Sequence, residues 1–337
     1  MCSDQPGRGD STTILVTGSS GFIGGSICRY LGPREIIGLD LVRGENRLHR
    51  EVISDIASEK FIDNFKPEGS IDAVVHTVAY ISSAFCQQNP LAAFRVNFGG
   101  TLNMLEIARK LDIKRFIYIS SGGVYGTSGP NETITESRAP APDGIYSTTK
   151  VSSELAIMEY CKSYSINGIA LRITAPYGPG MNGSKYPFNI PDSLHRHTLL
   201  FAIRCVHSQD IDMPVGGDHT VNYTYVDDIA EAARLSLTSS VGGFEVFNIA
   251  GGKNYTIREL GEAVASLCPS ISVSIGPGDL LKGLDPSDPM LSRLHIKQGL
   301  FDISKARRML GFVPKYDLRE GMKRLIEYVK LQAKRSP

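Results

Sequence analysis

Short apolar runs alternate with longer amphipathic segments through the first half of this 337-residue chain. The runs that predict strands are 13–16, 36–39, 73–76, 116–120 and 168–173. The segments with the spacing of amphipathic helices are 22–31, 56–65, 90–111 and 146–164. Strands and helices in alternation predict an α/β fold, a doubly wound parallel sheet with helices on both faces.

The pattern changes after residue 173, where APYGPGMNGSKYPFNIP is rich in proline, glycine and asparagine and predicts a loop. Helices are then expected at 192–206, 227–237, 256–267, 304–310 and 318–332, with a strand at 221–226. We expect a first domain over 12–175, to which 215–250 returns, and a smaller part made of 176–214 and 251–330. Residues 1–11 are polar and glycine-rich and are expected to be a disordered terminus.

Composition excludes several classes of partner. The net charge is +1 and no basic block is present, so we expect no nucleic-acid partner. No apolar run approaches the roughly 18 residues needed to cross a membrane, and the N-terminus lacks the apolar core of a signal peptide. A cytoplasmic location is therefore expected.

The six cysteines are far apart in the sequence and form no C-x-x-C pair. They are Cys2, Cys28, Cys86, Cys161, Cys205 and Cys268. This scatter favours buried free thiols in a reducing compartment over disulfides or a zinc site.

The first predicted strand ends in the stretch TGSSGFIG, with glycines at 18, 21 and 24. Phe22 and Ile23 begin the helix that follows. Glycines in such a turn let the backbone approach a pyrophosphate, and the helix N-terminus faces the anion. Turn chemistry alone could also explain them, but their position after a strand predicts the dinucleotide site of a Rossmann-type domain.

The next predicted strand ends in Asp40. A carboxylate there can accept both ribose hydroxyls of NAD and would repel the 2′-phosphate of NADP. The alternatives are a surface aspartate in a turn, and a phosphate contact from the nearby Arg43. NAD is therefore the favoured cofactor, with NADP left open.

The stretch YSTTK places Tyr146 and Lys150 four residues apart, on one face of a helix. A lysine cation one turn away, together with a positive nicotinamide ring, lowers the pKa of a tyrosine. Tyr146 could then take the proton of a secondary alcohol while hydride passes to the cofactor. Ser121, at the end of RFIYISS, could hold the substrate oxygen or be no more than a polar strand end.

Ordered motifs along nearly the whole chain resemble those of one family. They are TGSSGFIG, HTVAY, VNFGGTLNMLEIAR, SSGGVYG, YSTTK, LRITAPYGPG, YTYVDDIA and FDISKARRMLG. The chain is similar to the extended short-chain dehydrogenases/reductases, in the NAD-dependent epimerase/dehydratase group that includes UDP-galactose 4-epimerase.

The resemblance implies roles for individual residues. The catalytic group would be Ser121, Tyr146 and Lys150. The cofactor would contact Gly18, Gly21, Phe22, Ile23, Gly24, Asp40, Asp55, Ile56, His76, Val78, Ala79, Asn97, Tyr146 and Lys150. It also implies a homodimer, formed through a four-helix bundle of the 90–111 and 146–164 helices.

Two departures from the family pattern concern the substrate. Gly122 and Gly123 stand where dehydratases carry Asp-Glu, so a dehydratase is not expected, and the glycines should leave space over the nicotinamide. Ala175 and Val221 stand where nucleotide-sugar members usually carry Asn and Arg near the substrate diphosphate. These two changes weaken the interpretation of the substrate as a nucleotide sugar, although Arg293 or Lys297 could compensate.

The loop and helix after residue 181 offer further polar side chains for the substrate, from Asn182, Tyr186 and Arg196. The full set of expected substrate contacts is Ser121, Gly122, Gly123, Asn182, Tyr186, Arg196 and Arg293. His195 and His197 lie two residues apart and would diverge on a helix, so no metal is expected.

The leading hypothesis is an NAD-dependent epimerase that moves hydride from and to a secondary alcohol carbon of a nucleotide sugar. The alternative is an NAD-dependent dehydrogenase or reductase of a non-nucleotide sugar, sugar acid or other small carbonyl compound. A regulator that binds NAD without turnover is a third reading, which the Tyr146–Lys150 pair disfavours.

Overall fold

The computed structural model describes residues 12–32, 36–44, 48–181, 197–278, 280 and 299–334. The predicted substrate residues Asn182, Tyr186, Arg196 and Arg293 lie outside these ranges, as do residues 1–11.

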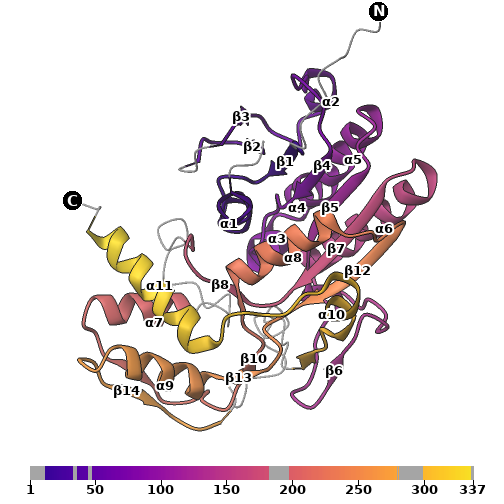
Figure 1. Cartoon of the computed structure of the whole chain (residues 1–337). Coiled ribbons are helices and arrows are strands. Elements are labelled where there is room, and N and C mark those ends of the chain that lie inside the picture. The colour runs from indigo at the N-terminus through magenta and orange to yellow at the C-terminus, as the bar shows by residue number, and fades with distance from the viewer. Residues whose placement is uncertain are drawn as a thin grey trace, which may run out of the picture.

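A parallel sheet forms the centre of the molecule (Figure 1). Within the described residues it contains β1 (Ile14–Thr17), β2 (Ile36–Asp40), β3 (Arg50–Ile53), β4 (Ala73–His76), β5 (Arg115–Ser121), β7 (Asn167–Ile173) and β12 (Phe244–Ile249). Their order is β12-β7-β5-β4-β1-β2-β3, and every pairing is parallel. The order reverses between β1 and β4, and folds of this kind bind ligands beyond the strand ends at that point. The predicted fold class is confirmed.

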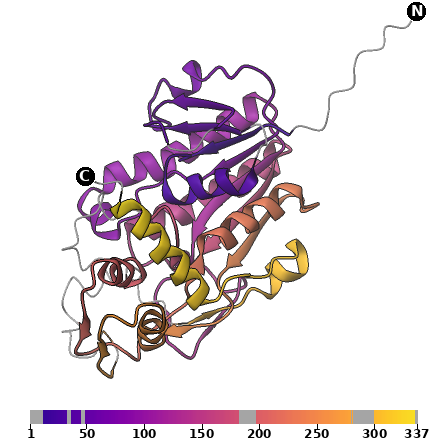
Figure 2. The ribbon, with the colours of Figure 1, turned by 60° about the vertical axis from the view of Figure 1, so that its left-hand side comes forward.

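Helices cover both faces of the sheet, as Figure 2 shows. On one face α1 (Phe22–Leu31), α8 (Val226–Thr238) and α10 (Ser304–Leu310) enclose a core with Val16, Ile119 and Phe247. On the other, α2 (Phe61–Asn64), α5 (Gly100–Lys110) and α6 (Ile145–Ser163) enclose a core with Val74, Phe116 and Ile157. Burial of apolar area on both faces, at about 25 cal/mol per Å², holds the strand ends in place.

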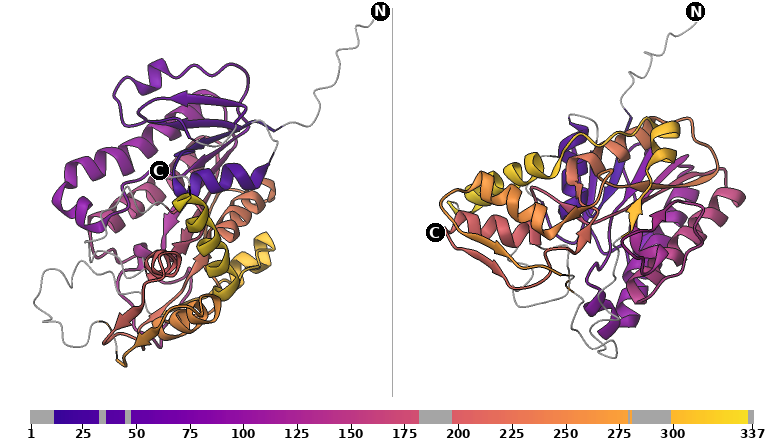
Figure 3. Two further views of the ribbon diagram at one scale, coloured as in Figure 1. Left: turned by 90° about the vertical axis from the view of Figure 1, so that its left-hand side faces the viewer. Right: turned by 90° about the horizontal axis from the view of Figure 1, so that it is seen from below.

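A smaller lobe lies beyond the carboxyl ends of the strands (Figure 3). Its helices are α7 (His197–Val206), α9 (Ile257–Leu267) and α11 (Leu318–Ala333), packed on one another. Its strands form the pairs β8 (Pro176–Tyr177) with β11 (Thr224–Tyr225), β9 (Ile211–Met213) with β14 (Val273–Ile275), and β10 (Thr220–Val221) with β13 (Tyr255–Thr256). A further pair, β6 (Thr133–Ile134) with β15 (Leu300–Phe301), joins distant parts of the chain. The domain boundaries drawn from the sequence stay a prediction.

Several predicted elements differ from the observed ones. The expected helix at 56–65 is shortened to α2, because the Asp55 carboxylate accepts a hydrogen bond from the Ala57 backbone at 2.8 Å and forms a turn there. The expected helix at 90–111 is divided into α4 (Pro90–Ala93), a π-helical turn (Phe94–Gly99) and α5. The strands β3 and β12 and the helix α3 (Ser83–Gln88) were not predicted.

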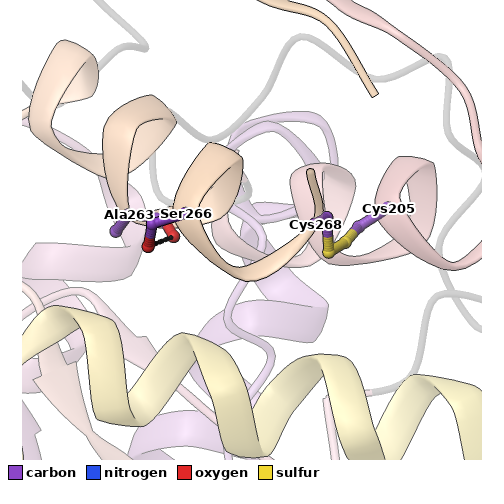
Figure 4. The surroundings of a disulfide bond; sticks show 4 residues. All are labelled: Cys205, Ala263, Ser266 and Cys268. Atoms are coloured by element: carbon purple, nitrogen blue, oxygen red, sulfur yellow. Dashed lines mark hydrogen bonds between the residues drawn. A yellow bond between two sulfur atoms is a disulfide. The ribbon is translucent and has the colours of Figure 1, made fainter. Parts of the chain in front are cut away.

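The cysteine prediction is wrong for one pair. Cys205 of α7 and Cys268, which follows α9, form a disulfide, with their Cα atoms 6.1 Å apart (Figure 4). The two residues are 63 positions apart, and only the packing of α7 against α9 brings them together. Cys28, Cys86 and Cys161 are free and buried, as expected.

None of the helices within the described ranges is long and apolar enough to span a bilayer. The cytoplasmic location stays a prediction. The disulfide does not favour it, because disulfides are uncommon in reducing compartments.

Candidate active site

The glycine turn after β1 is packed so tightly that it has no room for side chains at Gly18 and Gly24. Gly18 has φ of +70°, and a Cβ there would lie 2.5 Å from the Thr77 hydroxyl. A Cβ on Gly24 would overlap the carbonyl oxygen of Gly18. The turn can therefore be this tight only with glycine at both places.

The helix α1 begins directly after this turn. Gly21 is its N-cap and offers no side-chain hydrogen bond to the first turn of the helix. Phe22 and Ile23 are the first two helical residues, so their backbone N–H groups lack intrahelical acceptors. A helix N-terminus of this kind attracts the negative charge of a pyrophosphate.

Asp40 ends β2 beside the turn. Its carboxylate accepts hydrogen bonds from the backbone N–H groups of Ser20 at 3.0 Å and Leu41 at 2.7 Å. Each carboxylate oxygen has a further lone pair, so the group can still accept ribose hydroxyls. The residues present therefore fit the adenosine half of NAD.

Asp55 and Ile56 follow β3, at the same edge of the sheet. Ile56 is buried against Gly100 at the start of α5, and its carbonyl accepts a hydrogen bond from Asn103 at 2.7 Å. Their predicted contact with the adenine stays a prediction.

The three predicted catalytic residues lie together at the carboxyl end of β5. The Ser121 hydroxyl lies near the Tyr146 phenol and acts to lower its pKa, and it accepts the backbone N–H of Gly123 at 3.0 Å. Lys150 lies one turn further along α6, with its Nζ 5.8 Å from the Tyr146 ring centroid and 2.8 Å from the carbonyl oxygen of Ile119, to which it donates. Spacing along α6 thus brings the tyrosine and the lysine to the end of the strand that carries the serine.

Burial shifts the proton affinities of this group. Removal from water raises the pKa of Tyr146 to about 12, while the nearby Ser121 hydroxyl acts in the opposite direction. Burial lowers the pKa of Lys150 to about 7, against the nearby Glu154 carboxylate, which raises it. Shifted pairs of this kind are typical of reactive sites.

A buried ion pair supports the catalytic strand end, and the sequence prediction missed it. The Ser120 hydroxyl donates to Glu154 Oε1 at 2.6 Å, and Arg172 of β7 donates to both oxygens of the same carboxylate. Two signals could have revealed it. Glu154 lies four residues after Lys150 on the same helix face, and Arg172 interrupts an otherwise apolar strand.

His76 and Asn97 lie beneath the site, and both are 0% exposed. The ring nitrogens of His76 lie 2.7 Å from the Thr17 hydroxyl and 3.0 Å from that of Thr101, so neither is left to bind a cofactor. Contacts from the strand end itself, including Val78 and Ala79, stay a prediction.

Gly122 does not leave open space, contrary to expectation. Gly122 and Gly123 lie in a buried 3-10 turn (Gly122–Tyr125). A Cβ on Gly122 would lie 2.9 Å from the ring of Phe301 and 3.1 Å from a methyl group of Thr174. The glycine is therefore required because the C-terminal strand β15 packs against it.

The two family departures, Ala175 and Val221, are both buried in the apolar core of the smaller lobe. Val221 is 2% exposed and pairs with Tyr255 across β10 and β13. Ala175 has φ of +29°, which residues other than glycine and asparagine rarely adopt.

Across the ranges that the structure describes, no three His, Cys, Asp or Glu side chains are grouped to hold a metal ion. The expectation that the protein needs no metal stays a prediction, because residues 182–196 and 281–298 lie outside those ranges.

A dinucleotide-type turn and a tyrosine–lysine pair meet at one edge of a doubly wound sheet, and together they place the chain among NAD-dependent enzymes of the extended short-chain dehydrogenase/reductase type. The model of the NAD dependent epimerase/dehydratase family matches residues 14–250. The chain belongs to this family.

One curated relative and two solved structures agree with this assignment. A Methanocaldococcus jannaschii protein described as a putative UDP-glucose 4-epimerase is 29% identical, over 94% of this chain and 98% of its own. UDP-glucose 4-epimerase from Thermotoga maritima, solved with UDP-glucose, is 26% identical with a TM-score of 0.80, covering 96% of this chain and 100% of that one. The Thermus thermophilus UDP-glucose 4-epimerase, solved with NAD, is 25% identical with a TM-score of 0.74, covering 94% and 98%.

Proposed function

We propose that this protein is an NAD-dependent nucleotide-sugar epimerase, which inverts one secondary alcohol carbon of the sugar. The observation that carries the proposal is the cluster at the end of β5, where Ser121 and Tyr146 lie near each other and Lys150 lies one helical turn away. Similarity to UDP-glucose 4-epimerases along the whole chain supports the substrate class.

NAD, when bound, accepts a hydride from the substrate carbon and returns it. In the proposed reaction Tyr146 takes the proton of the substrate hydroxyl and gives it back, while Ser121 holds the same oxygen. A phenol with a pKa of about 12 would cost about 7 kcal/mol to ionise at neutral pH. The Lys150 cation and the positive charge of the oxidised cofactor reduce this cost, because both stabilise the phenolate.

Dehydration is disfavoured by the residues next to Ser121. Loss of water from a sugar needs groups that donate and accept protons beside the reacting carbons. Gly122 and Gly123 have no side chain to do so, and the position of a side chain on Gly122 is filled by Phe301 and Thr174. Hydride return to the other face of the keto sugar needs no such groups.

A second candidate is an NAD-dependent dehydrogenase or reductase of a sugar without a nucleotide. It is favoured by Ala175 and Val221, which are buried and apolar where family members usually contact the substrate diphosphate. A lost hydrogen bond to a charged group costs about 1.5–3 kcal/mol, or roughly tenfold to a hundredfold in affinity.

The proposal includes a homodimer formed through α4, α5 and α6. Its support is exposed apolar surface on these helices, with Leu91 85% exposed on α4 and Leu155 54% exposed on α6. Sedimentation of the protein and of Leu155→Glu tests this. The expected result is a dimer that the substitution weakens, and a monomeric parent protein would contradict it.

The activity is tested with a panel of UDP-, GDP- and CDP-sugars and of free sugars and sugar acids. Two quantities are followed in each reaction, the NADH absorbance and the isomer composition by chromatography. The epimerase proposal expects isomer exchange without net NADH, abolished in Tyr146→Phe. Net NADH formed only with sugars that lack a nucleotide would overturn it in favour of the dehydrogenase.

A further inference from the structure

His76 ends β4 in the middle of the sheet, and its ring is enclosed on all sides. The ring stacks on Tyr118, with centroids 5.7 Å apart. Its Nδ1 lies 2.7 Å from the Thr17 hydroxyl and its Nε2 lies 3.0 Å from the Thr101 hydroxyl. A ring that is hydrogen-bonded at both nitrogens and hidden from solvent is part of a hydrogen-bond network inside an apolar core.

The positions of the protons in this hydrogen-bond network can be deduced from its donor groups. Thr101 has one hydroxyl proton and donates it to the carbonyl oxygen of Asn97 at 2.7 Å. Thr101 must therefore accept from His76, which places the proton on Nε2. Burial and the Lys150 cation lower the pKa of His76 to about 3, so the ring is neutral and its Nδ1 accepts from Thr17.

Thr17 extends this hydrogen-bond network toward the glycine turn. Its hydroxyl oxygen accepts the backbone N–H of Thr77 at 3.2 Å, and its carbonyl oxygen accepts from the Thr77 hydroxyl at 2.7 Å. Thr77 is the residue whose hydroxyl lies against Gly18. One end of the hydrogen-bond network is thus fixed to the glycine turn that is predicted to bind the cofactor.

Asn97 connects the other end to Tyr146. Asn97 lies in the π-helical turn that divides the expected long helix, and π-helical turns occur frequently at functional sites. Its amide group donates to the Thr149 hydroxyl at 3.0 Å, and Thr149 donates to the carbonyl oxygen of Tyr146 at 2.7 Å. The same amide holds the backbone of Tyr80 at 2.7 and 3.1 Å, in the loop that follows Val78 and Ala79.

We infer that His76 is a positioning residue, which acts through Thr101 and Asn97 to fix Tyr146 and the loop after β4 against each other. The inference rests on the proposed function, in which Tyr146 exchanges the substrate proton. A displacement of about 1 Å in such a group can reduce the rate a hundredfold. Contacts that the substrate makes outside this loop and helix would be unaffected. A change at His76 should therefore lower kcat and leave KM nearly unchanged.

The two ring nitrogens provide a matched pair of variants. His76→Gln places an amide N–H where Nε2 lies and keeps the donor to Thr101. His76→Asn places an amide oxygen where Nδ1 lies and keeps the acceptor for Thr17 alone. Both replace the ring by an amide in the same cavity, and each keeps one link: Gln keeps the link to Thr101, which leads to Tyr146, and Asn keeps the link to Thr17, which leads to the glycine turn.

Kinetics of the holoenzyme on a sugar nucleotide give the first readout. His76→Gln should keep kcat within a few-fold of the parent enzyme, whereas His76→Asn should lose roughly tenfold to a hundredfold in kcat with KM little changed. Thr101→Val should resemble His76→Asn. Thr101→Ser keeps the hydroxyl and should therefore keep the rate of the parent enzyme. Equal kcat for the Gln and Asn variants would overturn the inference.

A second readout needs neither substrate nor variants. The ¹⁵N resonances of His76 should show a neutral ring protonated at Nε2 from pH 8 down to pH 5. A ring protonated at Nδ1, or charged in this range, would overturn the inference even if the protein acted on no sugar nucleotide. Failure of the proposed function alone would leave this tautomer in place.

Discussion

The Glu154 carboxylate accepts two hydrogen bonds from the Arg172 guanidinium, at 3.0 and 2.6 Å, and each side chain is 5% exposed. Through Ser120 the pair supports the strand end that carries Ser121, and Glu154 lies one turn from Lys150 on α6. Charges this deep are tolerated only when they are paired.

Removing one partner of this pair should destabilise the protein strongly. Glu154→Gln leaves Arg172 as an uncompensated buried cation, so we expect a loss of about 3–5 kcal/mol in the free energy of unfolding. The double variant Glu154→Gln/Arg172→Met should recover much of that loss. Urea denaturation of both variants measures it, and additive losses in the double variant would contradict the expected coupling.

The glycine turn offers a comparison with a built-in control. Gly18→Ala forces a Cβ to within 2.5 Å of the Thr77 hydroxyl, so we expect at least a tenfold weaker affinity for NAD. Gly32 at the end of α1 has the same φ of +70° but no heavy atom within 4 Å of a Cβ. Gly32→Ala should cost about 1 kcal/mol in stability and leave NAD binding unchanged. Calorimetric titration with NAD measures both, and equal losses of affinity would contradict the expected steric effect.

Lys150 should lower the stability of the protein at neutral pH. Its pKa is lowered from 10.5 in the unfolded chain to about 7 in the fold. Between these values the unfolded chain holds the proton and the folded protein does not, so this group makes stability rise with pH from 7 toward 10.5. The stability of the parent protein relative to Lys150→Met should therefore increase from pH 6 to pH 9.5. A constant difference across this range would contradict the shift, and the Met variant should be inactive throughout.

The disulfide should be present in the purified protein. Peptide mapping without reductant should join the peptides that carry Cys205 and Cys268, and Cys28, Cys86 and Cys161 should be alkylated only after unfolding. Closing a loop of 63 residues stabilises a fold by up to about 4 kcal/mol, so reduction should lower the free energy of unfolding by an amount of that order. Cys205→Ser is the matched control, because its stability should not respond to reductant.

Much of the site could be predicted because its residues are set by local spacing. Gly18 and Gly21 follow the end of β1, Asp40 is the last residue of the adjacent strand β2, and Tyr146 and Lys150 are one helical turn apart. Parallel strands end at one edge of a sheet, so such residues must meet there.

The features that were missed depend on contacts between distant segments. Phe301 fills the space beside Gly122 from 179 positions away, and Arg172 reaches Glu154 across a strand–helix interface. Glu154 and Arg172 each carry a sequence signal, but no spacing pairs them with each other, and none pairs Phe301 with Gly122. His76 was assigned to the cofactor by resemblance, and only the packing of β1, β4 and α5 around its ring shows the two hydroxyl partners.

The most direct test of the central claim is rapid mixing of the NAD-loaded enzyme with UDP-glucose, with absorbance of the reduced cofactor followed in time. Oxidation of the substrate alcohol removes one proton and one hydride, so the parent enzyme should show transient reduction of the cofactor, followed by decay of that signal as the isomer forms. Tyr146→Phe should still bind NAD and should reduce it at least a hundredfold more slowly than the parent enzyme. Equal rates of reduction in the two proteins would contradict the role of Tyr146 as the group that accepts the substrate proton.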